Sequence, residues 1–158
     1  MPTDPYCQLT ITGRIAEAPS FDAERLQRVC DDALREAGHE AAALTVELVD
    51  DSRSAELHVD HFNDPEPTDV MTFPDGGVDP EIGCVHLGDL AVGIDVARRM
   101  AVERHGSEQR AGEELELYIL HGLLHLLGYD DIEPDLRATM WQRQHELMAR
   151  VGIDIGDA

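Results

Sequence analysis

The segment that most constrains the fold is an apolar run that contains two histidines four positions apart, His121 and His125. Side chains at positions i and i+4 of an α-helix lie on the same face, so this spacing predicts that both imidazoles point the same way. Apolar side chains surround the pair, as is typical of a helix that is buried on all sides; they are Leu115, Tyr118, Ile119, Leu120, Leu123, Leu124, Leu126 and Leu127. Gly128 follows, and glycine readily takes the left-handed conformation that ends a helix. The sequence therefore predicts a buried helix that ends at about residue 127.

Asp131 lies three residues beyond this glycine, where the chain can turn back toward the two imidazoles. Two histidine nitrogens and one carboxylate at this spacing are typical ligands of a first-row divalent metal with an open coordination position. Such a position holds a water that acts as a nucleophile near neutral pH. The alternative is a pair of packed core histidines, but each buried imidazole then needs a polar partner. We interpret His121, His125 and Asp131 as candidate metal ligands.

Hydrophobic periodicity and turn residues predict mainly strands in the first half of the chain and helices in the second. The expected strands are 6–12, 43–49, 70–73 and about 83–92, and the expected helices are 22–37, 51–62, 95–104, 111–127 and 133–151. Two prolines in the segment 63–67 predict a loop there. Short connections in the middle of the chain favour a mixed sheet covered by helices, so the predicted class is α+β. We expect the histidine helix to be central, with its metal-bearing end at a cleft.

The length of 158 residues fits one domain with its own core, so we expect a single catalytic domain over 1–158 with frayed ends at about 1–5 and 152–158. The first residues lack the pattern of a secretory signal, and no apolar run approaches the roughly 18 residues of a membrane span. The three cysteines, Cys7, Cys30 and Cys84, contain no CxxC pair and fit reduced thiols. These features favour a cytoplasmic protein with no membrane partner.

The formal net charge of −21 limits the partners of this chain. Phosphate binding normally depends on Lys and Arg, so non-specific attraction to nucleic acid is disfavoured. The charge is uneven, because residues 44–92 contain twelve acidic residues and one arginine, whereas residues 93–110 contain four arginines and three acidic residues. We expect a polyanion to approach the second segment, unless its arginines only form a solvated helix face.

Three motifs follow one another along the chain: Pro67-Thr-Asp-Val-Met-Thr-Phe73, Leu87-Gly-Asp-Leu90 and the histidine segment. With them the chain resembles the YbeY family of bacterial rRNA-maturation endoribonucleases, which shows a PTDVLSF-like segment, an LGD segment and HGxLHLxGYDH in the same order. The resemblance covers about residues 40–150. It implies an α+β fold and metal-dependent cleavage of RNA, of the single-strand type, in 3′-end maturation of the small-subunit (16S) ribosomal RNA and in ribosome quality control. The implied partners are the ribosomal RNA precursor, the small ribosomal subunit and ribosomal or assembly proteins.

The resemblance also implies a ligand set. The family's usual metal is zinc, held by three histidines; His121 and His125 match the first two, and Asp131 replaces the third. Aspartate also ligates zinc, but its negative charge lowers the Lewis acidity of the metal. Two histidines and one carboxylate also accept iron, manganese or nickel. Asp130 matches the family's own aspartate, and we expect it to orient a ligand.

Phe62 is a second position at which the chain departs from the family pattern. The family commonly has an arginine near this position that is thought to support catalysis. Its loss removes charge stabilisation from a phosphate-cleaving site, and the catalytic residues stay unassigned. Asp69 is expected either to orient a ligand or to form a turn. Asp89 lies inside an apolar strand and is expected to have a buried partner. His58 and His86 lie outside any ligand spacing and are expected to be structural or surface groups.

Two other functions stay open. The spacing HxxxHxxGxxD equals that of a zinc metalloprotease motif, but such proteases carry a glutamate general base directly after the first histidine, where this chain has Gly122. The second alternative is a non-catalytic ribosome-assembly factor, because the acidic composition, Phe62 and Asp131 fit a protein that acts through protein partners.

Overall fold

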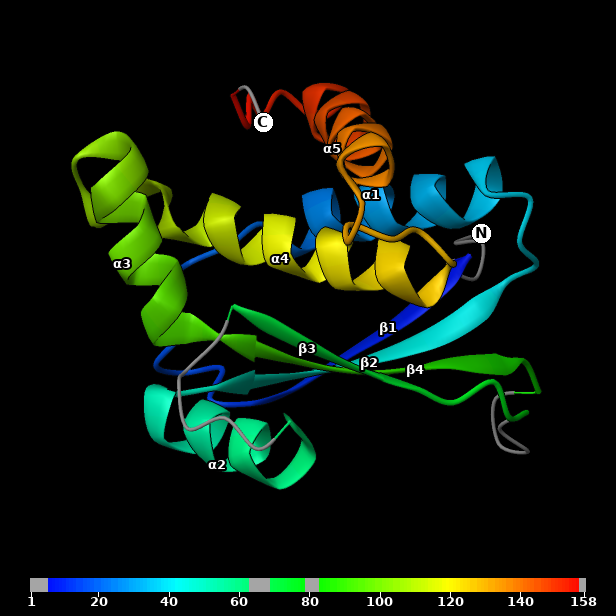
Figure 1. Ribbon diagram of the computed structural model, residues 1–158, viewed down its shortest axis with the longest axis horizontal. Coiled ribbons are helices and arrows are strands. Elements are labelled where there is room, and N and C mark those ends of the chain that lie inside the picture. Colours follow the sequence, from blue (N-terminus) through cyan, green and yellow to red (C-terminus); the bar gives the residue numbers. More distant parts are fainter. Residues whose placement is uncertain (1–5, 63–68, 79–82, 157–158) are drawn as a thin grey trace.

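A computed structural model describes residues 6–62, 69–78 and 83–156, which form one mixed sheet with helices on both faces (Figure 1). The strands are β1 (Cys7–Gly13), β2 (Ala42–Val49), β3 (Val70–Pro74) and β4 (Val85–Gly93). The helices are α1 (Ala23–Glu36), α2 (Asp51–Phe62), α3 (Ile94–His105), α4 (Ala111–Leu126) and α5 (Pro134–Ala149), with a short 3₁₀ helix, η1 (Glu108–Arg110). The expected α+β class is confirmed, and each expected helix and strand is present within a few residues of its predicted bounds.

The sheet has the strand order β1-β2-β4-β3. Strand β2 runs parallel to both β1 and β4, whereas β3 runs antiparallel to β4. A register shift between Ala43 and Leu44 of β2 lies opposite Gly88 of β4, which takes a φ of +154°. A Cβ atom on Gly88 would lie 2.4 Å from the carbonyl oxygen of Phe73 and 3.2 Å from Leu126 of α4. The glycine of the Leu-Gly-Asp motif therefore lets the end of α4 approach the sheet closely.

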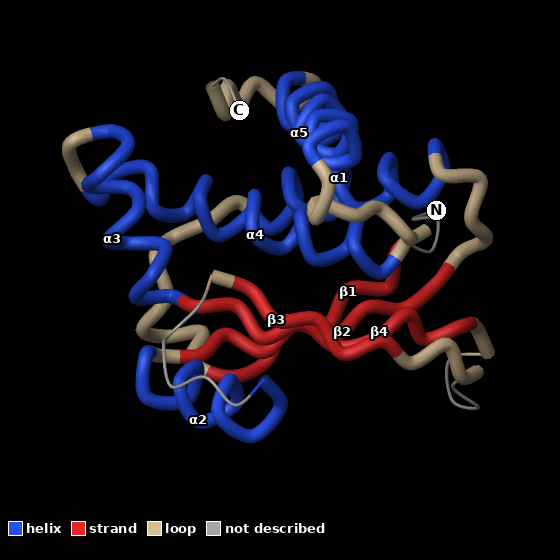
Figure 2. The backbone as a smooth tube through the Cα atoms, in the orientation of Figure 1, coloured by secondary structure: helices blue, strands red, loops and turns tan. Residues whose placement is uncertain are grey.

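The helices lie on both faces of the sheet, as Figure 2 shows. Helices α4 and α1 lie on one face, α5 packs on their outer side, and α2 lies on the opposite face (Figure 1). The main core lies between the sheet and α4, where Leu115, Leu120 and Leu123 are fully buried against Leu44 and Leu90. Burial on this scale explains why α4 carries apolar residues almost all round. Among the described residues, no helix is long and apolar enough to cross a membrane.

The segment 152–158 is expected to be frayed, and the structure describes residues 152–156 of it. Ile153 is buried with 3% of its surface exposed, and the carbonyl oxygen of Gly156 accepts a hydrogen bond from Nε1 of Trp141 at 3.3 Å. An apolar anchor and a side-chain donor on α5 therefore hold this segment. Residues 1–5 and 157–158, Thr68, the predicted loop 63–67 and the side chain of Phe62 lie outside the described residues.

The expected buried partner of Asp89 is also absent from the described structure. Asp89 lies on the open face of β4 with 57% of its side chain exposed, and its Oδ1 lies 3.7 Å from Nε2 of His86. Successive residues of a strand face opposite sides of the sheet, so Leu90 points into the core and Asp89 points away from it. His86 contacts Asp75 and Thr45 through its two ring nitrogens and is a structural group, as expected.

Candidate metal centre

The two histidines lie in the last two turns of α4, and the chain reverses directly after them. Gly128 takes a φ of +104°, a left-handed conformation that side chains other than glycine rarely adopt. Its N–H donates to the carbonyl of His125, and the N–H of Tyr129 donates to the carbonyl of Leu124, both at 3.0 Å. These bonds satisfy the last carbonyl groups of the helix. The turn therefore brings the following residues back over the end of α4, as predicted.

Three donor atoms meet at this end of the helix. Nε2 of His121 lies 3.0 Å from Nε2 of His125, and Oδ2 of Asp131 lies 3.5 Å and 3.6 Å from these two nitrogens. Ligands at about 2.0–2.1 Å from a tetrahedral zinc are separated by about 3.3 Å, so the three spacings bracket the value that one ion requires. The structure thus brings together all three residues that the sequence singles out, and they form a group that can hold a metal ion.

The hydrogen bonds of the two imidazoles fix which nitrogens face the shared point. Nδ1 of His121 lies 2.5 Å from Oε1 of Gln144, and Nδ1 of His125 lies 3.1 Å from the carbonyl oxygen of Tyr129. Both partners are acceptors, so each Nδ1 carries the proton and each Nε2 presents a lone pair. Two lone pairs at 3.0 Å repel each other unless a proton or a metal cation lies between them. The donor set therefore fits a divalent metal, and its geometry is that of metal-binding histidines whose other nitrogen is held by a protein acceptor.

Asp130 was expected to orient a ligand, but in the described structure it holds a turn instead. Its Oδ1 accepts a hydrogen bond at 3.0 Å from the N–H of Ile132, which closes a tight turn around Asp131. The residue that orients a histidine is Gln144 of α5, which is 2% exposed. Sequence reasoning missed it because the hydrogen bond joins residues 23 positions apart on two different helices.

Two cavities adjoin the donor group and share Asp69, His121 and Asp131. The first, which we call the histidine cavity, has a volume of about 320 Å³ and includes His58 of α2. His58, which was expected to be a structural or surface group, therefore lines the same cavity as the donor group. Its position arises from the packing of α2 against the sheet, which no spacing in the sequence reveals. Asp69 lines both cavities, and its Oδ1 accepts a hydrogen bond from the N–H of Val70.

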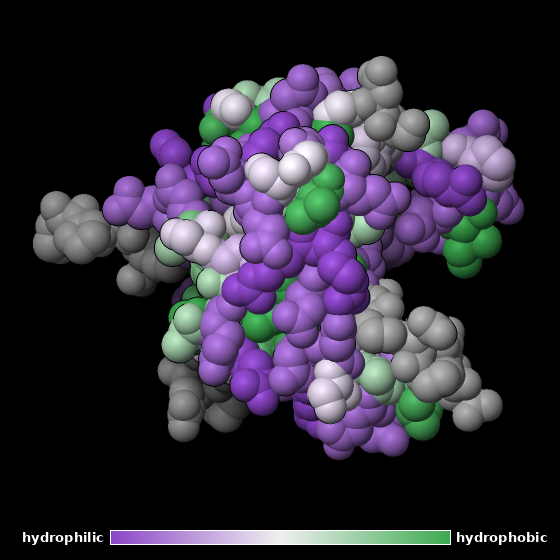
Figure 3. All heavy atoms as spheres, turned by 90° about the vertical axis from the view of Figure 1, so that its left-hand side faces the viewer, coloured by the Kyte–Doolittle hydropathy of each residue, from purple (hydrophilic) through white to green (hydrophobic). Residues whose placement is uncertain are grey.

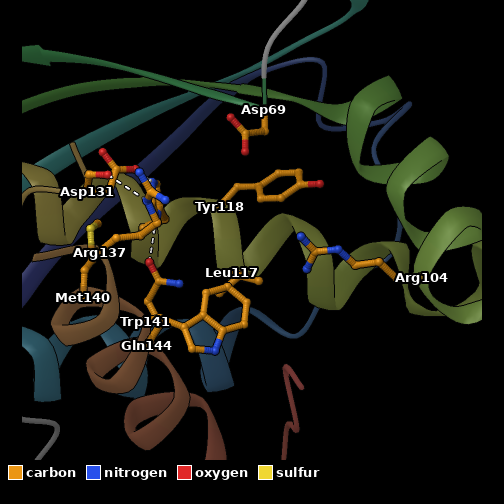
Figure 4. Close-up of a pocket in the computed structure, with 10 residues that line it drawn as sticks. Asp69, Arg104, Leu117, Tyr118, Asp131, Arg137, Met140, Trp141 and Gln144 are labelled. Atoms are coloured by element: carbon orange, nitrogen blue, oxygen red, sulfur yellow. Dashed lines mark hydrogen bonds and ion pairs between the residues drawn. The ribbon is translucent and has the colours of Figure 1, made fainter. Parts of the chain in front are cut away.

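The second cavity, which we call the tryptophan cavity, has a volume of about 210 Å³ and lies between α3, α4 and α5 (Figure 4). Trp141, Arg104 and Arg137 line it, together with Tyr118. Burial, followed by the negative charge of Glu114, raises the pKa of the Tyr118 phenol far above its usual range, so the hydroxyl keeps its proton. The hydroxyl is buried and lies beside the buried side chain of Glu114.

Fold and donor set together define an α+β protein with a candidate metal centre at the end of its central helix. The family model described as endoribonuclease YbeY matches residues 14–152. The chain belongs to the YbeY family.

Individual relatives agree with this assignment. The chain is 44% identical to the endoribonuclease YbeY of Thermobifida fusca over 138 residues, which cover 81% of this chain and 84% of the relative. It is 40% identical to that of Frankia alni and 38% identical to that of Mycolicibacterium smegmatis, over 68% and 70% of this chain and 62% and 64% of the relatives. The solution structure of a Thermotoga maritima protein shares the fold, with a TM-score of 0.55, 24% identity, and coverage of 91% of this chain and 89% of that one.

Proposed function

We propose that this chain is a metal-dependent endoribonuclease that cleaves RNA in the 3′-end maturation of small-subunit ribosomal RNA and in ribosome quality control. His121, His125 and Asp131 are the proposed ligands, and residues 1–158 act as one catalytic domain. The observation that carries the proposal is the convergence of two bare Nε2 atoms and one carboxylate oxygen at a single point. Membership of a family named for endoribonuclease activity supports RNA as the substrate.

The ligand set gives the centre its chemical character. A divalent cation supplies Lewis acidity there: it stabilises the negative charge that develops on a cleaved phosphate group and makes water a stronger acid. Zinc is the proposed ion, and the Asp131 carboxylate also suits iron, manganese or nickel. Gln144 and the Tyr129 carbonyl hold the imidazoles in one tautomer, so that the site is formed before an ion arrives.

Other residues of the chain act on the substrate side of the centre. The guanidinium group of Arg137 donates to the carbonyl oxygens of Asp131 and Ile132 at 3.0 Å and 3.3 Å, which fixes one positive charge beside the donor group. A cation held there attracts a phosphate and stabilises charge that develops on it. Arg137 is thus a candidate for the role that the arginine replaced by Phe62 has in the family.

The proposed biological setting is the cytoplasm, on the small ribosomal subunit and its RNA precursor, together with ribosomal or assembly proteins. The acidic net charge of −21 favours basic protein partners over bare RNA at long range. Association with a membrane is not part of the proposal.

The test uses purified protein and a small-subunit ribosomal RNA precursor, with and without a chelator. We expect cleavage with zinc, loss of cleavage with chelator, and recovery when zinc is restored. The His121→Ala variant should lose both bound metal and cleavage, and full activity of metal-free His121→Ala protein would refute the proposal. A non-catalytic assembly factor would bind the subunit and leave the RNA intact under all of these conditions.

The packing of Gly122 argues against the metalloprotease alternative. A Cβ atom at this position would lie 2.8 Å and 2.9 Å from the methyl groups of Leu90 and 3.1 Å from Val70. This side of α4 is pressed against β4 and β3, so a side chain at position 122 would require Leu90 and Val70 to shift. The chain therefore lacks the general base of such proteases, and a side chain at its position would have to displace core residues.

A further inference from the structure

We propose that the tryptophan cavity binds one unpaired nucleotide of the RNA next to the scissile phosphate, with its base stacked on Trp141 and its phosphates held by Arg104 and Arg137. The inference rests on the proposed function and deepens it, because it assigns the side from which single-stranded RNA enters the metal centre. Figure 4 shows Arg137 and Asp131 at one end of this cavity and Arg104 at the other, with the Trp141 ring between them.

The two cavities that adjoin the donor group differ in the charge of their lining residues. The tryptophan cavity has two arginines that balance its two aspartates, so a bound divalent cation makes it positive. The described residues around the histidine cavity include the same two aspartates, Asp69 and Asp131, and no arginine. The same cation only neutralises the histidine cavity, so a polyphosphate backbone is attracted more strongly to the tryptophan cavity.

The two arginines differ in how they are held. Arg137 is bound by backbone carbonyls, and no carboxylate of the described residues pairs with it, so its charge remains available to a phosphate. Arg104 lies 3.6 Å from the buried carboxylate of Glu114, which positions its guanidinium group at the opposite end. Arg104 belongs to the arginine-bearing segment 93–110. Arg98 and Arg99 of the same segment pair with Asp95 and Asp51 and do not line this cavity.

Trp141 has the features of a stacking platform. Its Nε1 donates to the carbonyl of Gly156 at 3.3 Å, which fixes the ring by its edge and leaves a face to line the cavity. Base stacking on an aromatic side chain is tolerant of sequence and requires an unpaired base. The cavity volume of about 210 Å³ is below the roughly 300–1,000 Å³ of pockets that enclose a drug-sized ligand, so it suits one base rather than a longer segment.

The cleft continues beyond this nucleotide. A third cavity of about 580 Å³ shares Arg104 and Trp141 with the tryptophan cavity and adds His105 and Arg110. Arg110 is anchored to the carbonyl of Asp154 at 3.0 Å. Seen from the α3 side, the described surface is mainly hydrophilic, with small and separate apolar areas (Figure 3). Such a surface suits a solvated RNA strand better than an apolar protein segment.

The first experiment uses Trp141 as its own reporter, because it is the single tryptophan of the chain. Zinc-loaded protein is titrated with a single-stranded deoxyribonucleotide decamer, which an endoribonuclease leaves intact, and with the same sequence as a duplex. Stacking should quench the tryptophan fluorescence saturably with the single strand and not with the duplex. Absence of quenching by the single strand, or equal quenching by the duplex, overturns the inference.

The second experiment separates stacking from structure with two substitutions at one position. Both Trp141→Phe and Trp141→Leu lose the hydrogen bond to Gly156, but only phenylalanine keeps an aromatic face. We expect Trp141→Leu to raise the KM for single-stranded RNA about 5- to 100-fold, and Trp141→Phe to stay within about threefold of the unaltered protein. Equal KM values in the two variants overturn the stacking role.

Arginine substitutions test the phosphate contacts. Arg104→Gln and Arg137→Gln should each raise KM and reduce the salt dependence of binding by about 0.7 per lost contact. Arg28→Gln, which removes the same charge from α1 outside the cavity, is the matched control and should change neither. Cleavage with unchanged KM in Trp141→Leu, Arg104→Gln and Arg137→Gln overturns this inference and leaves the proposed function intact. Quenching specific for single strands without any RNA cleavage refutes the proposed function and supports the cavity as a binding site.

Discussion

Gln144 of α5 accepts a hydrogen bond through Oε1 from Nδ1 of His121 on α4, at 2.5 Å and in a buried position. This contact determines the proton position of the imidazole and therefore the nitrogen that faces the candidate metal. It also joins the helix that carries the ligands to the helix that carries Trp141. Metal affinity and the docking of α5 are thus linked through one amide group.

Substitution of Gln144 tests this link. Gln144→Leu removes the acceptor, so His121 loses its fixed tautomer, and we expect zinc affinity to fall about 10- to 100-fold. Gln144→Glu keeps an acceptor at the same place and should retain most of the affinity. Competition with a chromophoric chelator measures both values. Gln142→Leu on the exposed side of the same helix is the control, since Gln142 contacts Glu146 and not a histidine.

Substitution of Asp131 tests the ligand assignment. Asp131→Ala should reduce bound zinc well below one ion per chain, because only two protein ligands remain. Asp131→His restores a third neutral nitrogen and should bind zinc at full stoichiometry. Elemental analysis of protein purified without chelator gives the readout. Asp130→Asn keeps the acceptor that closes the turn and should bind as the unaltered protein does; a larger loss there than in Asp131→Ala would contradict the assignment.

Gly128→Ala tests the turn that ends α4. No atom outside its immediate neighbours lies within 4 Å of a Cβ added there, so the cost comes from the φ of +104° alone. We expect a loss of about 1–2 kcal/mol in the free energy of unfolding, measured by urea denaturation. Gly77→Ala is the comparison, because Gly77 does not have a positive φ and a Cβ there meets only the flexible end of Asp75. Equal stability of Gly128→Ala and the unaltered protein would show that the turn tolerates a side chain.

We expect the ion pair between Glu36 and Arg150 to make a pH-dependent contribution to the free energy of unfolding. The hydrogen bond with Arg150 lowers the pKa of the Glu36 carboxyl in the folded state. A carboxyl whose folded pKa is depressed stabilises the protein above its unfolded pKa of about 4.3, and this contribution disappears as the pH falls through the lower folded value.

The pair is partly exposed, so solvent screening limits its contribution to about 0.5 kcal/mol. Glu36→Gln should therefore lower the free energy of unfolding by that amount at pH 7 and by less at pH 3. Glu40→Gln, at an exposed acid without an arginine partner among the described residues, should have no such difference. A Glu36→Gln effect of equal size at both pH values would contradict the assignment to this ion pair.

Much of the fold was predictable because its signals are local. The alternation of residues 43–49 and the periodicity of residues 111–127 each mark one element, and Gly128 marks where α4 ends. The order of the strands was not predictable, since it depends on which apolar faces meet after the chain has folded. Asp89 shows the same limit: the sequence places it in an apolar strand, but only the coverage of the sheet decides that it faces solvent.

The candidate site likewise contains residues that local spacing identifies and residues that only packing brings together. Its three donors lie within one segment, and their spacing identifies them. Gln144, His58 and Trp141 come from other helices, and each has an unremarkable local sequence. Their roles follow from packing between distant elements, for which a single sequence carries no periodic signal.

The close spacing of the three donors has an evolutionary consequence. All of them lie between positions 121 and 131, and Asp131 lies on a surface turn with 41% of its side chain exposed. A lineage can therefore exchange this side chain for another ligand without rearranging a single strand of the sheet. Divergence in metal preference is open to such a protein at little risk to its folding.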